Sequence, residues 1–179
     1  MNGRLVSIVA VLGLVVFAAG ADTSVAAENS GAPAASSEPT LEFVFEENVT
    51  LAQGIPVGKT ALGTRNIIPI TGGTFEGPRI KGTIMPGGWD WQLVRADGCV
   101  HIKADYMIKT DDGAVINVLN QGFACRDENG NPIPLRTFPV FEPPLGKYEW
   151  LGKHVFVGTL VPSTDAGGPG VKIRFYQVK

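Results

Sequence analysis

The side chains best suited to chemistry are those of Asp90 and Tyr106, which lie in two neighbouring β-rich runs of the chain. A carboxylate that is partly removed from water can act as a general base, and a tyrosine hydroxyl can stabilise a developing negative charge. Asn120 lies in the next run and offers an amide for the same purpose. The three residues could instead form a buried hydrogen-bond network that only specifies the fold. The residues alone leave these two interpretations open.

Two charged residues are further candidates for ligand binding. Arg79 follows the turn signal Gly77-Pro78 and could hold an anionic group, although a surface ion pair is the commoner role of such a residue. Glu142 ends a strand-like run just before two prolines, where a solvated carboxylate is the simplest expectation. A set of aromatic residues could line a pocket or simply fill a core: Trp89, Trp91, Tyr148, Trp150 and Phe156.

The rest of the sequence argues against several common chemistries. The only histidines are His101 and His154, and the two cysteines are expected to be oxidised, so no metal site is expected. Ser163 is the only serine after residue 40, and no G-x-S-x-G motif is present, which argues against a serine hydrolase. Residues 54–60 resemble a P-loop but have too few residues between the glycines, so we interpret them as a connection between strands. Any reaction is expected to use acid–base chemistry without a cofactor.

The elements that must position these residues are short β-rich runs separated by glycine, proline and aspartate. Because no helices intervene, the runs predict an all-β fold, an antiparallel barrel or sandwich. The expected strands span residues 40–50, 65–70, 79–85, 90–95, 99–109, 114–124, 135–142, 153–160 and 171–178. The expected turns contain residues 72–73, 86–88, 97–98, 111–113, 127–130 and 167–170.

One hairpin can be predicted to the level of its register. A type I turn followed by a left-handed Gly113 pairs Thr110 with Ala114. The same register places Cys99 directly opposite Cys125, so we expect a disulfide, as is usual for a cysteine pair in an exported protein. The inward face of the first strand then consists of Ile102, Ala104, Tyr106 and Ile108.

The preceding hairpin has two possible registers. A three-residue loop turns Asp90 inward beside Tyr106, whereas a two-residue loop turns Trp89 and Trp91 inward, because a shift of one residue reverses every side chain. We favour the first by analogy with the neighbouring hairpin, while the hydrophobic pattern favours the second. In the first register, Asp90, Tyr106 and the inward Asn120 form a polar cluster at the mouth of an apolar barrel, which is a common form of small-molecule site.

The N-terminal residues predict export. Residues 1–4 carry one positive charge, residues 5–20 are apolar, and residues 25–27 match a cleavage site, so we expect residues 1–27 to be a signal peptide that is removed. Residues 28–39 would be a flexible linker and residues 40–179 one domain, secreted or periplasmic, without a stable membrane anchor. A net charge of −2 and the lack of a basic stripe argue against a nucleic-acid partner. Asn48 begins a sequon, which matters only in a eukaryote.

Several separated motifs resemble the DUF3237 family, also called UPF0311. They are residues 68–82, Gly87-Gly88 with Asp90-Trp91-Gln92, Tyr106 with residues 110–113, and Tyr148 with Trp150-Leu151 and residues 156–158. The resemblance covers nearly all of residues 40–179, and the signal peptide and the cysteine pair are departures from it. It implies a small antiparallel β-barrel, lipocalin-like or cyclase-barrel-like. Its family-like positions are Glu76, Arg79, Asp90, Trp91, Tyr106 and Asp112, and they bring no established catalytic set. Asp112 has a ready explanation as a turn residue. Glu76, Trp91 and Gln92, which adjoins Trp91 in the same motif, join the candidate ligand-binding residues.

The function that we expect is that of an extracytoplasmic enzyme of the isomerase, cyclase, hydratase or lyase type, acting on an apolar or aromatic small molecule. Asp90 and Tyr106 would be catalytic. The alternative is a non-catalytic, lipocalin-like binding protein, and a third hypothesis is a structural barrel that is filled solid. An enclosed cavity with an inward carboxylate favours the enzyme. The substrate and the oligomeric state are left open.

Overall fold

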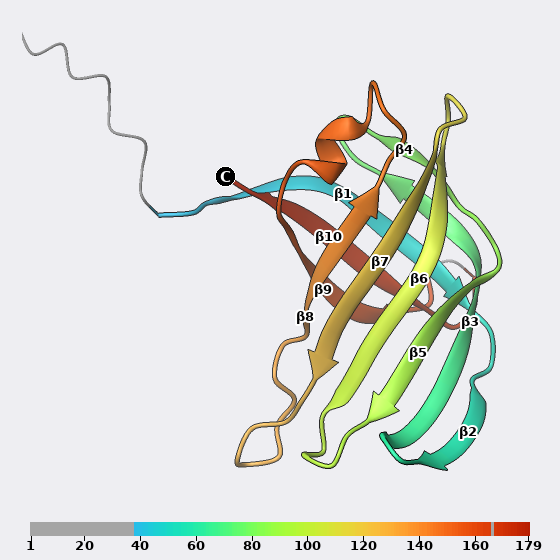
Figure 1. The fold of residues 1–179 in the computed structure, drawn as a ribbon, viewed down its shortest axis with the longest axis vertical. Helices are drawn as coiled ribbons and strands as arrows, with labels where there is room; N and C mark the ends of the chain where they lie inside the picture. Colours follow the sequence, from blue (N-terminus) through green and yellow to red (C-terminus); the bar gives the residue numbers. More distant parts are fainter. Residues whose placement is uncertain (1–37, 166) are drawn as a thin grey trace, which may run out of the picture. The chain divides into compact units, whose positions relative to one another are not determined.

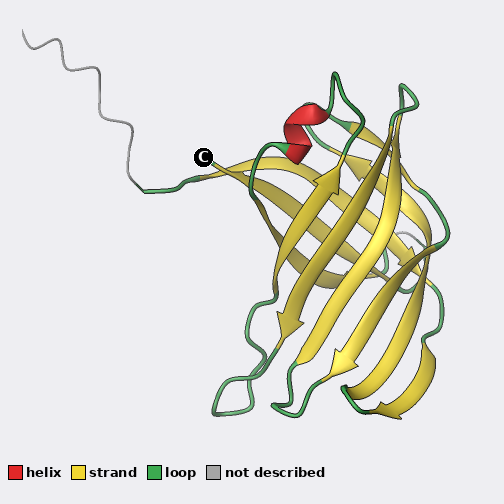
Figure 2. Ribbon diagram, in the orientation of Figure 1, coloured by secondary structure: helices red, strands yellow, loops and turns green. Residues whose placement is uncertain are grey.

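The computed structural model describes residues 38–165 and 167–179, so the predicted signal peptide and most of the predicted linker lie outside the described residues. The described residues form one compact unit built almost entirely of strands (Figures 1 and 2). The elements are β1 (Leu41–Leu51), β2 (Ile55–Thr60), β3 (Gly63–Glu76), β4 (Lys81–Ile84), β5 (Gly88–Val94), β6 (Val100–Thr110), β7 (Val115–Ala124), β8 (Arg136–Glu142), the 3-10 helix η1 (Glu149–Gly152), β9 (Phe156–Ser163) and β10 (Gly170–Val178).

The strands close into an 8-strand antiparallel β-barrel, which confirms the predicted fold class. Around the barrel the order is β1, β10, β9, β8, β7, β6, the pair β4 and β5, and β3, which pairs with β1 and closes the ring. Strands β4 and β5 follow one another in the same position between β3 and β6. Strand β2 forms a hairpin with β3 and occupies most of the segment that we expected to be a connection. Within the described residues, no helix is long and apolar enough to cross a membrane.

Strand β3 corrects one prediction. It runs without interruption through Gly72 and Gly73, which we expected to form a turn. Both glycines have positive φ, and a Cβ atom on Gly73 would clash with the carbonyl oxygen of Asn48 on β1. Glycine allows this close approach, so β3 changes partners along its length, from β2 and β5 to β1 and β4.

The predicted register of the β6–β7 hairpin is confirmed. The backbone N–H of Thr110 donates to the carbonyl oxygen of Ala114 at 2.9 Å, and the strands stay in this register to their far ends. Cys99, which precedes β6, and Cys125, which follows β7, lie just beyond those far ends and are joined by a disulfide. The local turn signal and the two cysteines, which are 26 residues apart, therefore both indicate the same register of β6 against β7.

The β5–β6 hairpin adopts the three-residue loop that we favoured. The backbone N–H of Arg95 donates to the carbonyl oxygen of Cys99 at 2.9 Å, and the loop glycine has positive φ. In this register Asp90 lies opposite Ala104 and faces the barrel interior, while the tryptophans on either side of Asp90 face outward.

One end of the barrel interior is filled by phenylalanine side chains. The ring of Phe45 lies 5.0 to 5.8 Å from those of Phe75, Phe141 and Phe175. Helix η1 lies at this end (Figure 1) and adds the buried side chain of Leu151. We call this region the packed end of the barrel, defined by Phe45, Phe75, Phe141, Phe156, Phe175, Tyr148 and Leu151.

Candidate functional site

The opposite end of the barrel interior is hollow. It holds a cavity of about 70 Å³. We call this region the hollow end of the barrel. Its apolar lining consists of Val49, Leu51, Ile70, Ile102, Ala104, Leu160, Val171 and Ile173, and its polar lining of Asp90, Gln92, Tyr106 and Asn120. All four polar residues were predicted as site residues from the sequence. A larger hollow of about 580 Å³ contains none of these four groups, and one of about 370 Å³ borders only Tyr106 among them.

Asp90 is the inward carboxylate of this cavity and is only 8% exposed. Its Oδ2 accepts a hydrogen bond from the Gln92 amide at 2.9 Å, and its Oδ1 accepts one from the backbone N–H of Lys103 at 3.2 Å. Burial raises the pKa of Asp90, and the two hydrogen bonds oppose that rise because they favour the ionised form. A partly desolvated carboxylate of this kind is a better general base than an exposed one.

Tyr106 is paired with a second buried carboxyl group, that of Glu47 on β1. The Tyr106 hydroxyl donates to Oε2 of Glu47 at 2.6 Å, and both side chains are buried. Burial raises the pKa of Glu47 to about 8, with the hydrogen bond from Tyr106 opposing the rise. Burial and the adjacent carboxyl group also hold the pKa of Tyr106 well above its ordinary value. At neutral pH the pair therefore consists mainly of a carboxylic acid and a neutral phenol.

Strand geometry explains how Tyr106 reaches the interior. Gly88 of β5 lies beside it, and a Cβ atom at Gly88 would clash with the Cβ atom of Tyr106. The missing side chain leaves room for the phenol ring against the barrel wall. The same strand then presents Asp90 and Gln92 on its inward face, two and four residues further on.

Sequence reasoning missed Glu47, although a signal for it is present. In β1 the alternate residues Phe45, Val49 and Leu51 are apolar and face the interior, and Glu47 occupies the same face. A charged residue in the middle of an apolar alternation indicates a buried carboxyl group. Its partner, Tyr106, is 59 residues away, so the pairing depends on barrel closure.

Asn120 completes the polar lining. It lies on β7 directly opposite Ala104 of β6, and its side chain is buried. Its Oδ1 atom has no hydrogen-bond partner among the described residues. A buried amide that lines a cavity and is not fully satisfied is suited to hydrogen bonding with a ligand.

The other four predicted site residues lie outside this cavity. Trp91 faces outward and is 41% exposed, because neighbours of Asp90 on a strand point to the opposite face. Arg79 is exposed beside the packed end, where its guanidinium group lies 4.1 Å from the ring centre of Trp150. Glu76 and Glu142 are exposed at the ends of β3 and β8. The structure therefore does not bring these residues together with Asp90.

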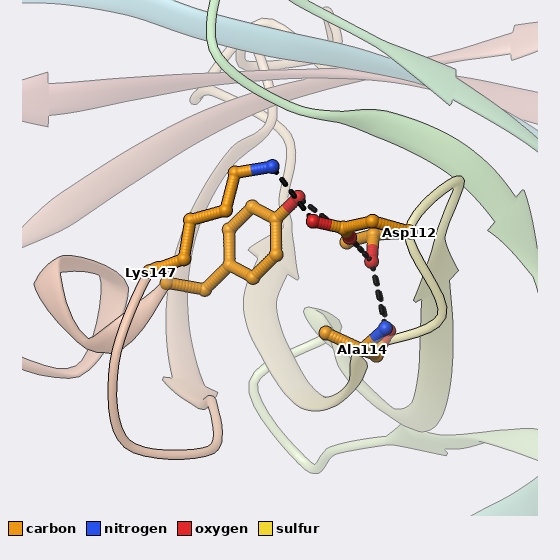
Figure 3. A network of polar contacts seen from close by, with 5 residues as sticks. Asp112, Ala114 and Lys147 are labelled. Atoms are coloured by element: carbon orange, nitrogen blue, oxygen red, sulfur yellow. Dashed lines mark hydrogen bonds and ion pairs between the residues drawn. The ribbon is translucent and has the colours of Figure 1, made fainter.

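Asp112, another family-like position, has a structural role at the packed end (Figure 3). Its carboxylate accepts hydrogen bonds from Lys147 at 2.7 Å, from the Tyr148 hydroxyl at 2.9 Å and from the Thr110 hydroxyl at 2.5 Å. The Thr110 hydroxyl in turn accepts from the backbone N–H of Ala114 at 2.9 Å. These donors lower the pKa of Asp112, with the hydrogen bond from Lys147 as the largest cause. The network fastens the β6–β7 turn to the segment before η1.

The arrangement can move protons within an apolar space. Among residues 38–165 and 167–179, no group of three or more histidine, cysteine, aspartate or glutamate side chains is placed to hold a metal ion. The cavity instead offers a desolvated carboxylate at Asp90 and a phenol at Tyr106 that is supported by Glu47. These are the components of general acid–base catalysis, and they also suit the binding of a ligand with hydroxyl groups.

Comparison with known proteins gives related sequences and folds. A UPF0311 protein of Rhodopseudomonas palustris is 34% identical over 141 residues, which is 71% of this chain and 92% of the relative. A Penicillium herquei protein named hydroalkoxylation enzyme phnH is 31% identical over 121 residues, which is 68% of this chain and 74% of the relative.

Solved structures share the same fold. A β-barrel-like protein from Acinetobacter baumannii superimposes with a TM-score of 0.70 at 33% identity, covering 79% of this chain and 97% of that one. An enzyme from Penicillium herquei gives a TM-score of 0.62 at 27% identity, covering 79% and 95%. This relationship and the barrel fold are compatible with an enzyme or a binding protein. Residues 39–178 match the model of DUF3237, a family of unknown function, and the chain therefore belongs to the DUF3237 (UPF0311) family.

Proposed function

We propose that this protein is an enzyme that adds an O–H group across a polarised C=C bond of a small apolar molecule, or catalyses the reverse elimination, without a cofactor. Asp90 acts as the general base, and Tyr106, supported by Glu47, acts as the general acid. The proposed location is outside the cytoplasm. The predicted signal peptide and the Cys99–Cys125 disulfide support that location.

The observation that carries the proposal is that two unlike acid–base groups serve one apolar cavity. Asp90 receives two hydrogen bonds that favour its ionised form. Glu47 is more deeply buried and receives its hydrogen bond from Tyr106, so it keeps its proton to about pH 8. When two carboxyl groups lie in environments that move their pKa values apart, the group with the lower pKa usually acts as the base and the group with the higher pKa as the acid.

The proposed reaction balances without a co-reactant. Asp90 removes the proton of a substrate hydroxyl while the oxygen forms a bond to one carbon of the double bond. Tyr106 delivers its proton to the other carbon, and Glu47 returns a proton to Tyr106. Asp90 then releases its proton to water and Glu47 regains one. In an intramolecular addition, the product is therefore an isomer of the substrate.

The family relationship supports this choice of reaction. The Penicillium relative is named for hydroalkoxylation, which is the addition of an alcohol O–H group to a carbon–carbon double bond. Such additions need acid–base catalysis and orientation, and they need neither a covalent nucleophile nor a redox group. The reaction falls within the hydratase, lyase and cyclase types that the sequence predicts.

The direct test is to incubate the full-length protein with a panel of ortho-alkenyl phenols and hydroxy-enones and to measure cyclic ether by chiral chromatography. We expect one enantiomer to form in excess. Asp90→Asn and Tyr106→Phe are expected to lower kcat/KM by roughly 10²-fold to 10⁴-fold, because each removes one proton-transfer group. Asp105→Asn is the matched control, since Asp105 is exposed on the outer face of β6.

The pH profile gives a second readout. Activity is expected to fall as the pH rises past about 8, where Glu47 loses its proton. Wild-type protein that binds members of the panel by calorimetry but converts none of them would favour the alternative, a non-catalytic binding protein. The mostly apolar lining of the cavity is the observation that supports that alternative. If the protein neither binds nor converts any member of the panel, that result would count against both functions.

A further inference from the structure

The outer surface of strands β5 to β8 is unusually apolar. Its exposed hydrophobic side chains, each 39–60% exposed, are Trp89, Trp91, Met107, Val115, Phe123, Phe138 and Val140. The outer surface of β1 and β10, across the barrel, instead carries ion pairs of Glu46 with Lys172 and Arg174. Soluble monomers seldom expose a contiguous apolar patch of more than a few hundred Å². The contrast between the two surfaces makes the β5–β8 face the candidate interaction surface.

The strand register arranges this face in two parallel rows. One row consists of Trp89, Asp105, Leu119 and Val140, which lie opposite one another on β5, β6, β7 and β8. The second row is two residues along each strand and consists of Trp91, Lys103, Gln121 and Phe138. Ala104 of β6, whose side chain points inward, lies between the rows. Each row thus contains one tryptophan, one charged residue and one exposed hydrophobic residue on β8, and the two charges are opposite.

We propose that this face joins two copies of the chain in a symmetric dimer. A two-fold axis that lies in the interface and crosses β6 at Ala104 places β6 antiparallel over the β6 strand of the second copy. The rotation exchanges the two rows, so each row faces the other row across the interface. Lys103 then meets Asp105 of the second copy, and by symmetry the same pair forms twice.

The rest of the face is complementary under the same rotation. Trp91 meets Trp89 of the second copy, and Phe138 meets Val140. Buried aromatic residues near the centre of an interface are the usual sources of binding energy. A hollow of about 370 Å³ beside Trp89 and Met107 offers space for side chains of the second copy. The partner is therefore a second copy of this chain, because the surface is complementary to itself.

The test uses sedimentation velocity of the full-length protein over a range of concentrations, and it does not depend on activity. We expect a dimer for the wild type. Lys103→Glu and Asp105→Lys each place like charges together twice, and each is expected to raise the dimer dissociation constant at least tenfold. The double variant Lys103→Glu/Asp105→Lys restores the opposite charges and is expected to recover the dimer.

A matched pair of valines tests the location of the interface. Val140 on β8 is 60% exposed, and Val161 on the outer face of β9 is 52% exposed. Val140→Glu is expected to give a monomer and Val161→Glu to remain dimeric, with circular dichroism confirming that both variants fold. A monomeric wild type would overturn the proposal. Sedimentation of that monomer with phosphatidylcholine vesicles would not rescue it, because the partner would then be a lipid surface. Equal effects of the two valine variants, or a double charge variant that stays monomeric, would also overturn it.

Discussion

The two ends of the barrel interior are built from the same strands but filled in opposite ways. At the packed end, β1 and β10 contribute Phe45 and Phe175, whose ring centres are 5.0 Å apart. At the hollow end, the same strands contribute the smaller Val49 and Ile173, which line the cavity. Glu47 lies between the two ends, one inward position from Phe45 and one from Val49.

The difference shows how one wall can provide both stability and a site. Interlocked aromatic rings supply apolar burial at the packed end, which η1 and the Asp112 network hold in place. The small inward side chain of Ala104 leaves space at the hollow end, where polar groups can meet a ligand. Because the stabilising contacts are concentrated at one end, the other end can keep a cavity and buried carboxyl groups.

The largest expected effect is a difference between two leucines, one at each end. Leu151→Ala at the packed end is expected to lower the free energy of unfolding by about 3–5 kcal/mol, because it opens a void in a close-packed core. Leu160→Ala is expected to cost only about 1–2 kcal/mol, because Leu160 is half-buried and already borders the cavity. Chemical denaturation of both variants measures the difference. Equal losses would contradict the distinction between a packed and a hollow end.

The next effect tests the buried carboxyl group at the boundary. The pKa of Glu47 is about 8 in the folded protein and 4.5 for the unperturbed group, so the folded state binds more protons between these pH values. The contribution of Glu47 to stability is therefore fully present below about pH 4.5 and is lost as the pH rises to about 8, by roughly 4–5 kcal/mol in total. Thermal unfolding from pH 5 to pH 8.5 measures this loss.

Glu47→Gln is the control for this prediction. The amide cannot ionise but can still accept the hydrogen bond from Tyr106, so the variant should lose less stability over this pH range. Burial raises the pKa of Asp90 in both proteins, so the difference between them isolates Glu47. The same slope in both proteins would show that Glu47 is ionised throughout.

The smallest effect tests the polar network at the packed end. Tyr148→Phe removes the hydroxyl that donates to Asp112 at 2.9 Å and is expected to lower stability by about 1 kcal/mol. Tyr176→Phe on the outer surface is the matched control and is expected to change stability by less than about 0.5 kcal/mol. Differential scanning calorimetry at neutral pH compares them. If Tyr176→Phe costs as much as Tyr148→Phe, the network does not contribute specifically.

Half of the predicted site residues lie in the cavity, and local geometry explains which ones. The turn within each hairpin sets the register of its two strands. The two registers determine that Asp90, Tyr106 and Asn120 all face inward. Trp91 was included because it adjoins Asp90 in the family-like motif, yet adjacent residues on a strand face opposite sides. Arg79 was chosen for its charge and its place after a turn in a family-like motif, and Glu142 for its charge at the end of a strand. Neither feature specifies a position around a closed barrel.

The sequence by itself determined the strand content, the register of the β6–β7 hairpin and the Cys99–Cys125 disulfide, because turn chemistry and a period of two act over short distances. It left two registers open for the β5–β6 hairpin, and the structure decided between them. Only the tertiary structure decided that β3 continues through Gly72 and Gly73, since that depends on the approach of β1. It also decided that Glu47 meets Tyr106 across 59 residues. Ring closure brings β1 onto β3, and no local pattern records which distant strand will supply the facing side chain.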